Sequence, residues 1–188
     1  MIITRLTLNN FGVYAGVNTF EFSGAKPVVL IGGMNGRGKT TFLEAILLAL
    51  YGSNSFAYNE SKYRTYGQYL KAYVNRADGS LESSVELEFK IASGKEESYL
   101  IKREWSGAST RVREKITVNK DGEFSSFLTA NWSMFIENIL PSGLSNFFFF
   151  DGEKIAELAV DSTNAQMKQS IKALLGITVL DSLGNDIS

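Results

Sequence analysis

The spacing of apolar residues changes from segment to segment along the chain, and it predicts an α/β fold. Residues 3–8 alternate along a half-buried strand, and residues 17–22 are expected to form a returning strand. Residues 27–31 are a short apolar run rich in β-branched side chains, which is typical of a buried strand in a parallel sheet. In residues 41–51 the apolar side chains recur at helical spacing, and Gly52 is expected to end that helix.

The second half of the chain predicts an antiparallel meander followed by a helix. Residues 83–91, 98–105 and 111–119 have the two-residue period of strands, and one face of their sheet is expected to be solvated. A loop is expected over residues 53–65, a short helix over 66–74 and an amphipathic helix over 124–140, before Pro141. The four phenylalanines at 147–150 cannot alternate between two faces, so they predict a central strand with Asp151 at its carboxyl end.

A glycine-rich stretch lies between the first apolar run and the first helix. It reads Gly33-Met34-Asn35-Gly36-Arg37-Gly38-Lys39-Thr40 and fits the G-x-x-x-x-G-K-[ST] pattern of phosphate-binding loops. Glycines let the backbone adopt positive φ angles, so that successive N–H groups point at an anion, and the helix start adds partial positive charge.

This loop predicts binding of a nucleoside triphosphate with Mg²⁺. The backbone amides of residues 35–40 are expected to hold the phosphates and Lys39 to neutralise the β- and γ-phosphates. The Thr40 hydroxyl is expected to bind Mg²⁺, and Thr41 to support the α-phosphate. ATP is the expected nucleotide, although no base-reading motif separates adenine from guanine.

Asp151 has two functional interpretations. It is either the acidic residue that holds the Mg²⁺ shell at the end of an apolar strand, with Glu153 orienting water, or part of a sensor loop that contacts Mg²⁺ or the attacking water. In the second case the true acidic strand lies elsewhere.

Composition excludes several classes of chemistry. The chain of 188 residues has no cysteine and no histidine, so disulfides, thiolate metal sites and histidine-based triads are not possible within it. No apolar run is long enough to cross a membrane and no signal peptide is evident, so a cytoplasmic location without membrane contact is expected. The net charge is −1, and two local clusters of cations are expected to be solvated faces: Lys62, Arg64, Lys71 and Arg76, and Lys102, Arg103, Arg111, Arg113 and Lys115.

The first fifty residues resemble the N-terminal lobe of SMC-class ATPases, which belong to the ABC-type group. In that class an N-F turn precedes an N-G-x-G-K-[ST]-[ST] loop, and here Asn10-Phe11 precedes the loop that ends in Thr40-Thr41. Residues 149–158, Phe-Phe-Asp-Gly-Glu-Lys-Ile-Ala-Glu-Leu, are similar more narrowly to DndD, the family of ATPases of bacterial DNA phosphorothioation (DNA sulfur modification). Residues 10–14 and 174–177 agree with that narrower resemblance.

The resemblance implies a P-loop NTPase head of ABC/SMC type, with parallel core strands, an antiparallel β meander and truncation at the start of a coiled coil. Residues 1–177 would be the N-terminal lobe of the head and residues 178–188 the start of the coiled-coil helix. Asp151 would then lie in the sensor loop, where the family usually has glutamine. The signature motif and the acidic strand of the family are not found here, so the chain alone is expected to be a weak or inactive ATPase.

The resemblance also implies partners: the protein's own C-terminal lobe, a homodimer of heads closed through ATP, DNA, and DNA-modification proteins. Two other functions stay open at this point. One is a non-hydrolysing regulatory nucleotide-binding module, and the other is an SMC-type ATPase of general double-strand-break repair. A small phosphoryl-transferring kinase shares the glycine loop, but no arginine-bearing lid or acceptor pocket is evident.

Overall fold

The computed structural model describes residues 1–22, 29, 31–32, 34 and 36–149, and of residues 93, 146 and 147 it describes the backbone only. The chain divides into two compact units, Met1–Ile139 and Leu140–Ser188. The first unit contains one six-stranded sheet with the strand order β2-β1-β3-β4-β5-β6, in which all neighbours are antiparallel. Its strands are β1 (Ile2–Phe11), β2 (Tyr14–Glu21), β3 (Glu82–Ser93), β4 (Lys95–Ser106), β5 (Glu114–Lys120) and β6 (Glu123–Phe124).

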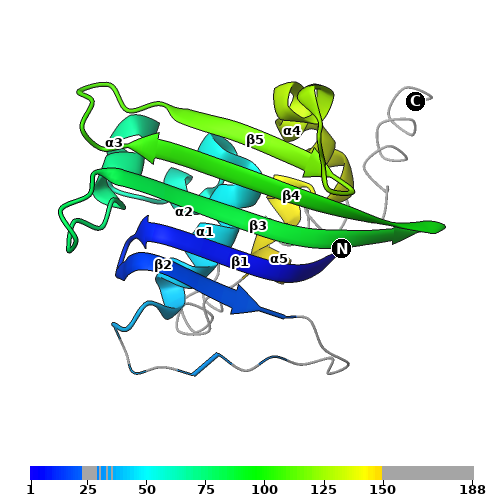
Figure 1. Ribbon diagram of the computed structural model, residues 1–188, viewed down its shortest axis with the longest axis horizontal. Coiled ribbons are helices and arrows are strands. Elements are labelled where there is room, and N and C mark those ends of the chain that lie inside the picture. Colours follow the sequence, from blue (N-terminus) through cyan, green and yellow to red (C-terminus); the bar gives the residue numbers. More distant parts are fainter. Residues whose placement is uncertain (23–28, 30, 33, 35, 150–188) are drawn as a thin grey trace, which may run out of the picture. The chain divides into compact units, whose positions relative to one another are not determined.

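The helices of the first unit lie behind the sheet in the view of Figure 1. The long helix α1 runs behind the middle strands, while α3 and α4 lie toward opposite ends of the sheet. Asn131 has non-helical angles (φ −117°, ψ 21°), so α4 is kinked there. The helices are α1 (Lys39–Tyr51), the 3₁₀ helix η1 (Gly52–Asn54), α2 (Phe56–Asn59), α3 (Tyr66–Ala72) and α4 (Ser126–Ile139).

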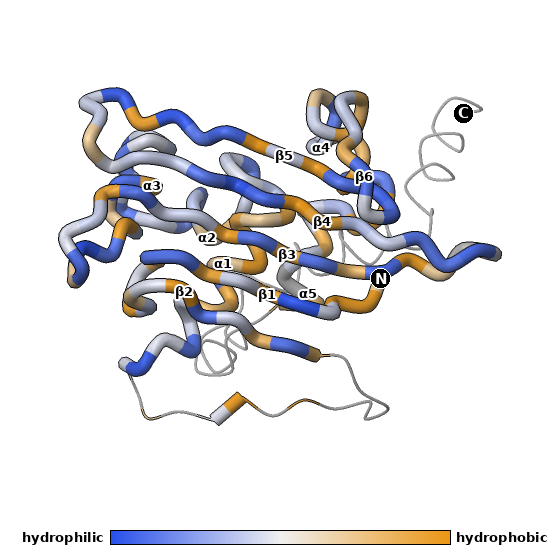
Figure 2. Tube along the Cα trace, viewed as in Figure 1, coloured by the Kyte–Doolittle hydropathy of each residue, from blue (hydrophilic) through white to orange (hydrophobic). Residues whose placement is uncertain are grey.

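The core lies between α1 and the inner face of the sheet. Val85, Leu87 and Phe89 of β3 are almost fully buried, and the residues between them are polar and point to the other face, which produces the colour alternation of Figure 2. Eight residues of α1 are buried, including Leu47 and Leu50. Packing a helix against one face of an antiparallel sheet leaves the other face solvated, as the two-residue period predicts.

Most of the predicted elements are confirmed. The paired strands at 3–8 and 17–22, the helix at 41–51 ended by Gly52, the short helix at 66–74 and the antiparallel meander all form. The loop predicted over 53–65 is wrong in part, because η1 and α2 lie within it. The expectation that Phe124 and Phe127 lie on the buried stripe of the last helix is wrong: they are 63% and 68% exposed, and Phe124 belongs to the edge strand β6.

The predicted parallel core is not shown by the described residues. Strand β1 pairs with β3 antiparallel, so the N-terminal hairpin and the meander form one sheet and not two separate sets. Val29 and Ile31 belong to no strand and are 52% and 44% exposed, and the rest of the 27–31 run lies outside the described residues. Val29 and Ile31 form no strand here because no described strand pairs with them. A parallel strand that is buried on both faces needs a neighbouring strand on each side.

In the second unit, the prediction of a strand over the four phenylalanines is wrong for residues 147–149, which are the ones that the structure describes. The chain turns through η2 (Ser142–Leu144) into α5 (Ser145–Phe148), and only Phe149 is extended, with φ −126° and ψ 90°. The Ser145 hydroxyl donates to the Ser142 carbonyl at 2.5 Å, so a local polar contact stabilises the turn at this point. Phe150, Asp151 and the boundary predicted at residue 177 lie outside the described residues.

None of the helices in the described part of the chain combines the length and the apolar character needed to cross a membrane.

Candidate nucleotide-binding site

The glycine loop leads directly into α1, as the sequence pattern requires. Gly36 and Gly38 have φ angles of 76° and 100°, in the left-handed region that favours glycine, and the Arg37 N–H donates to the Met34 carbonyl at 3.2 Å. Gly38 is the N-cap of α1 and makes no side-chain cap bond. The first turn of α1 contains no acidic residue, so its positive end is not neutralised from within the helix.

The predicted ligand residues that the structure describes gather at this helix end. Lys39 and Thr40 are exposed in the first turn, Arg37 is exposed just before it, and Thr41 is half-buried beneath. The Thr40 hydroxyl is an oxygen donor of the kind that Mg²⁺ takes, so the residues present fit one ligand of a magnesium-nucleotide complex. Gly33, Asn35 and Asp151 lie outside the described residues. Among the described residues no cluster of three or more acidic side chains could hold a metal alone.

The turn between β1 and β2 braces the loop from below. A Cβ added to Gly12 (φ 57°) would lie 2.4 Å from the Thr41 methyl, and one added to Gly38 would lie 2.6 Å from Val13. Both glycines are therefore required by close approach as well as by their φ angles. The N-F-G turn and the phosphate loop are in van der Waals contact, which gives a structural reason for their joint occurrence in the sequence.

The same turn is fastened on its other side to the end of α3. The Gly12 N–H donates to the Tyr73 carbonyl at 2.7 Å, and the Asn75 side chain donates to the Gly12 carbonyl at 2.8 Å. Phe11 is fully buried and stacks on Tyr73 with a ring-centroid distance of 4.9 Å. Sequence reasoning missed Asn75, because nothing in its local pattern indicates a contact with a turn 63 residues earlier.

The far end of α1 is held by buried donors. The Gly52 N–H donates to the Leu48 carbonyl, Arg103 Nε to the Ala49 carbonyl at 2.9 Å, and Trp132 Nε1 to the Leu50 carbonyl at 2.8 Å. These bonds satisfy carbonyls that the helix itself leaves without partners, and a cation at a helix carboxyl end is favourable.

Arg103 is also the centre of a buried polar network. Its side chain is 2% exposed, and Nη1 lies 2.6 Å from Glu114 Oε1, while the Tyr66 hydroxyl donates to Glu114 Oε2 at 2.8 Å. Burial, and then the Glu114 carboxylate, raise the pKa of Tyr66, so its hydroxyl remains a donor. A Cβ on Gly52 would lie 2.5 Å from the guanidinium, so the turn after α1 is shaped around Arg103. The prediction that Arg103 belongs to a solvated face is wrong.

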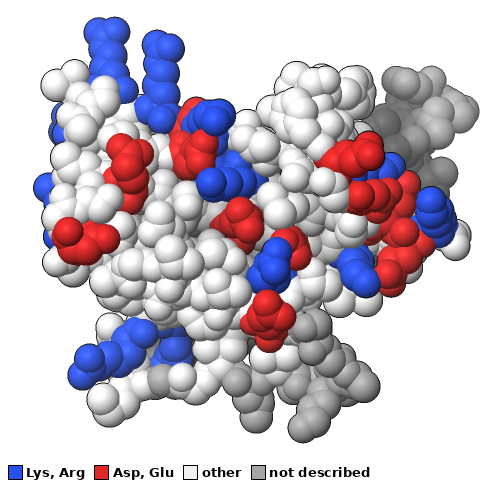
Figure 3. Space-filling model, in the orientation of Figure 1, with Lys and Arg blue, Asp and Glu red and all other residues white. Residues whose placement is uncertain are grey.

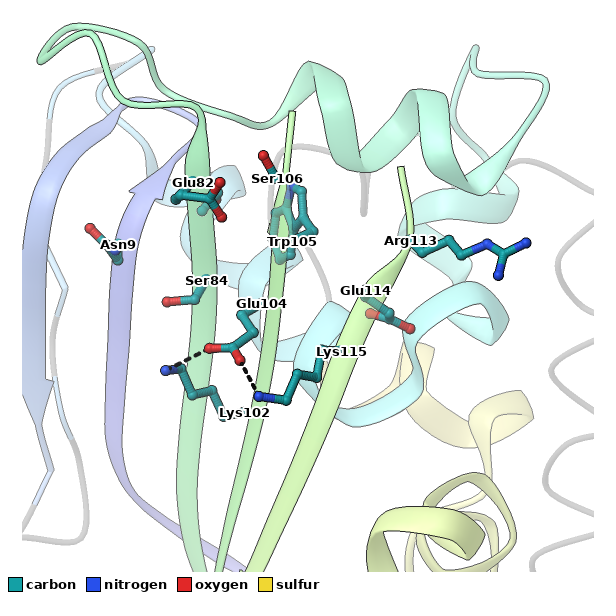
Figure 4. A pocket seen from close by; sticks show the side chains of 11 residues that line it. Asn9, Glu82, Ser84, Lys102, Glu104, Trp105, Ser106, Arg113, Glu114 and Lys115 are labelled. Atoms are coloured by element: carbon teal, nitrogen blue, oxygen red, sulfur yellow. Dashed lines mark ion pairs between the residues drawn. The ribbon is translucent and has the colours of Figure 1, made fainter. Parts of the chain in front are cut away.

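A shallow depression of about 630 Å³ lies elsewhere, on the solvated face of the sheet (Figure 4). Glu104 lies between Lys102 and Lys115, with N–O distances of 2.8 and 3.1 Å. The bonds from Lys102, and then from Lys115, lower the pKa of Glu104. The lining has three cations (Lys102, Arg113 and Lys115) and three carboxylates (Glu82, Glu104 and Glu114), so the depression has no net charge with which to attract a nucleotide.

A glycine loop opening a long helix, with an exposed lysine and threonine in the first turn, defines a P-loop nucleotide-binding protein. Comparison with family models agrees, because the model described as AAA domain matches residues 5–183, and the chain belongs to that family. The chain is 48% identical over 48 residues to the C subunit of the nuclease SbcCD of Treponema pallidum (strain Nichols), a match that covers 26% of this chain and 5% of the relative.

The chain is also 39% identical over 90 residues to the C subunit of the nuclease SbcCD of Staphylococcus haemolyticus (strain JCSC1435), covering 47% of this chain and 8% of the relative. It thus matches less than a tenth of the length of either relative. These findings support the resemblance to an SMC-class ATPase head. They give no support to the narrower resemblance to the DNA-sulfur-modification ATPases.

Proposed function

We propose that the chain is the nucleotide-binding N-terminal part of an SMC-class ATPase head, which takes ATP with Mg²⁺ at the start of α1. The observation that carries this proposal is the glycine-capped N-terminus of α1, whose first turn contains no acidic residue and against which the β1–β2 turn packs. In this proposal the amides of residues 35–40 bind the phosphates, Lys39 neutralises them and Thr40 binds Mg²⁺. Thr41 supports the α-phosphate, and Asp151 supplies a further oxygen near the metal.

Substitution of the loop lysine tests this proposal. Lys39→Ala removes one charge-assisted contact, so the affinity for ATP with Mg²⁺ is expected to fall by about 1.5–3 kcal/mol. Isothermal titration of the purified chain measures it. Lys95→Ala, at the exposed first residue of β4, is the matched control and is expected to bind as the wild type does. Equal affinity in wild type and Lys39→Ala would remove the phosphate-loop assignment.

The intact protein is proposed to close two heads around ATP and to hydrolyse it in work on DNA. The second lobe of the head would supply the missing signature motif and acidic strand, and it would also cover the exposed Val29 and Ile31 as strand neighbours. The 188-residue chain alone is therefore expected to turn over ATP negligibly. Robust, Lys39-dependent hydrolysis by this chain would instead favour Asp151 as its own acidic strand residue.

A one-sided charge distribution supports DNA as the partner. On the face of the sheet shown in Figure 3, blue and red side chains lie next to one another. The strand register places Arg5, Lys90, Lys102 and Lys115 on the face away from the helices, and each of them pairs with a glutamate. At the end of the sheet that carries α3 and the β4–β5 connection, Lys and Arg side chains project from the surface at the upper left of Figure 3. Six cations of these segments and their neighbours form no ion pair within the described part of the chain: Lys62, Arg64, Lys71, Arg76, Arg111 and Arg113.

These cations come from two separate sequence clusters that the fold brings together. Lys71 Nζ donates to the Ser109 carbonyl at 3.3 Å, and a Cβ on Gly67 would lie 2.9 Å from the Val112 carbonyl oxygen. Five of the six are exposed and Lys71 is half-buried. Cations that form no ion pair with the described residues attract a phosphate backbone more strongly than the paired charges of the sheet face do.

Duplex binding by charge variants tests the DNA proposal. Arg111→Ala with Arg113→Ala is expected to weaken binding of a labelled 30-base-pair duplex and to reduce the salt slope by up to about 2, since each phosphate contact contributes about 0.9. Fluorescence anisotropy at several salt concentrations measures both. Lys90→Ala with Lys115→Ala removes the same charge from the paired face and is expected to leave binding unchanged. An equal loss in both double variants would contradict a directed DNA surface.

Two DNA-directed functions are distinguished by their products. The names of the two relatives favour an ATPase that acts with a nuclease. The sequence of residues 149–158 favours DNA phosphorothioation. Deletion of the gene, followed by mass spectrometry of digested genomic DNA, decides between them, because loss of phosphorothioate linkages is expected only for the second.

A further inference from the structure

Tyr14 reaches from the start of β2 to the phosphate loop. Its hydroxyl donates to the Gly38 carbonyl at 3.0 Å, and its ring lies edge-on to Phe20 with a centroid distance of 5.6 Å. Burial raises the pKa of Tyr14, so the hydroxyl remains protonated and acts as a donor at neutral pH. The glycine-loop pattern gives no indication of this contact.

The accepting carbonyl belongs to the peptide unit that leads into Lys39. The Gly38 carbonyl also accepts the first helical bond of α1, from the Phe42 N–H at 2.8 Å. A trans peptide is planar, and its C=O and N–H point in opposite directions. Two donors on the Gly38 oxygen therefore fix the direction of the Lys39 N–H, which lies in the first turn of α1, where backbone N–H groups point out of the helix end.

Gly38 needs such an anchor because its own conformation does not supply one. Its φ of 100° is left-handed, it makes no side-chain cap bond, and a glycine rotates more freely than any other residue. The space for a side chain is occupied, since a Cβ on Gly38 would lie 2.9 Å from the Tyr14 hydroxyl oxygen.

We propose that Tyr14 is a positioning residue of the phosphate loop, whose hydroxyl orients the Gly38–Lys39 peptide so that its N–H faces the phosphates of the bound nucleotide. This rests on the proposed nucleotide-binding function. Tyr14 is placed behind the loop, where it acts on the phosphates through the backbone and not by direct contact. Its effect is accordingly on the polyphosphate part of any nucleotide and not on the base.

The test compares Tyr14→Phe with wild type by isothermal titration against ATP with Mg²⁺ and against inorganic tripolyphosphate with Mg²⁺. The variant keeps the ring and its contact with Phe20, and the loss of one oriented hydrogen bond is expected to raise both dissociation constants by the same factor, about 3- to 10-fold. Tyr99→Phe is the matched control: it also removes a tyrosine hydroxyl bond, to Glu97 at 2.7 Å, but on a strand remote from the loop. It is expected to leave both constants unchanged.

A spectroscopic readout separates positioning from general support of the fold. In ¹⁵N-labelled wild type the Lys39 amide resonance is expected to be among those that move most on addition of ATP with Mg²⁺, and in Tyr14→Phe this movement is expected to be smaller. A wild-type Lys39 amide that does not respond to nucleotide overturns the proposal without any variant.

Lys39→Ala distinguishes failure of this proposal from failure of the proposed function. If Lys39→Ala weakens binding and Tyr14→Phe does not, only the positioning role of Tyr14 is overturned. If neither the wild type nor the variants bind tripolyphosphate or ATP, both are overturned.

Discussion

The buried pair of Arg103 and Glu114 allows a stability prediction worked from its surroundings. Arg103→Ala leaves the Glu114 carboxylate, which is 15% exposed, without its cation, and it removes the bond to the Ala49 carbonyl. Loss of one partner from a buried pair costs roughly 3–5 kcal/mol in general. Because Glu114 keeps the Tyr66 hydrogen bond and some access to water, we expect a loss near the lower end, about 3 kcal/mol.

Removal of the other partner, Glu114, is expected to lower the free energy of unfolding by more. Glu114→Ala leaves the guanidinium of Arg103 buried at 2% exposure with the Ala49 carbonyl as its acceptor, so we expect a loss of about 4 kcal/mol. The double variant Arg103→Ala with Glu114→Ala leaves no uncompensated charge, and it is expected to cost at least about 2 kcal/mol less than the sum of the two single losses.

Urea unfolding followed by circular dichroism measures these free energies. The midpoint urea concentrations of two variants are compared only where the free energy of unfolding falls with urea at the same slope in both. Glu96→Ala is the control, since its partner Lys90 is 44% exposed and Glu96 itself 65%, and a surface pair of this kind contributes about 0.5 kcal/mol or less. Single losses below about 1 kcal/mol, or losses that simply add in the double variant, would refute the argument that burial makes this pair mutually dependent.

Three further predictions concern the supports of the loop and the core. Gly12→Ala is expected to lower the free energy of unfolding by about 2–4 kcal/mol in thermal melts, because the residue has a left-handed φ and its new Cβ would lie 2.4 Å from Thr41. Gly79→Ala is the control: φ is 79° and the space around it is open, so only the cost of the left-handed φ is expected, about 1–2 kcal/mol. Trp132→Phe leaves the buried Leu50 carbonyl without its donor and should cost about 1–3 kcal/mol in urea unfolding; a neutral result would contradict the bond. Burial raises the pKa most strongly for four tyrosines: Tyr51, Tyr66, Tyr69 and Tyr73. The folded state therefore binds more protons than the unfolded state at high pH, so the free energy of unfolding should be constant up to about pH 10 and fall above it. Tyrosinate absorbance at 295 nm should rise together with unfolding, and ionisation of all tyrosines before unfolding would count against this prediction.

Local pattern was sufficient where an element depends on its own residues. The pattern after the glycine loop predicted a helix over residues 41–51, and α1 begins two residues earlier, at Lys39. The two-residue period predicted the meander and its solvated face. The same period also contained the signal for the buried arginine, since Arg103 shares its strand parity with the buried Ile101 and Trp105. Grouping Arg103 with neighbouring cations by charge alone concealed that parity.

Local pattern failed where an element depends on distant partners. An apolar run such as 27–31 or 147–150 is compatible with a central strand only if strands flank it, and the sequence does not state which segments those are. The bond from Tyr14 to Gly38 and the bond from Asn75 to Gly12 likewise depend on how the hairpin folds back onto α1 and α3. The predicted roles of Gly33, Asn35 and Asp151 stay predictions.

Helix α1 is held at both ends. At its N-terminus, Gly12 of the β1–β2 turn packs against Thr41, and Val13 of the same turn packs against Gly38. At its C-terminus, Arg103 and Trp132 donate hydrogen bonds to its last carbonyls. A helix held in this way does not slide or pivot relative to its own sheet without breaking buried bonds. In the proposed function, a displacement that nucleotide binding causes at the start of α1 would therefore be passed to the sheet of Met1–Ile139, and α1 would not move alone.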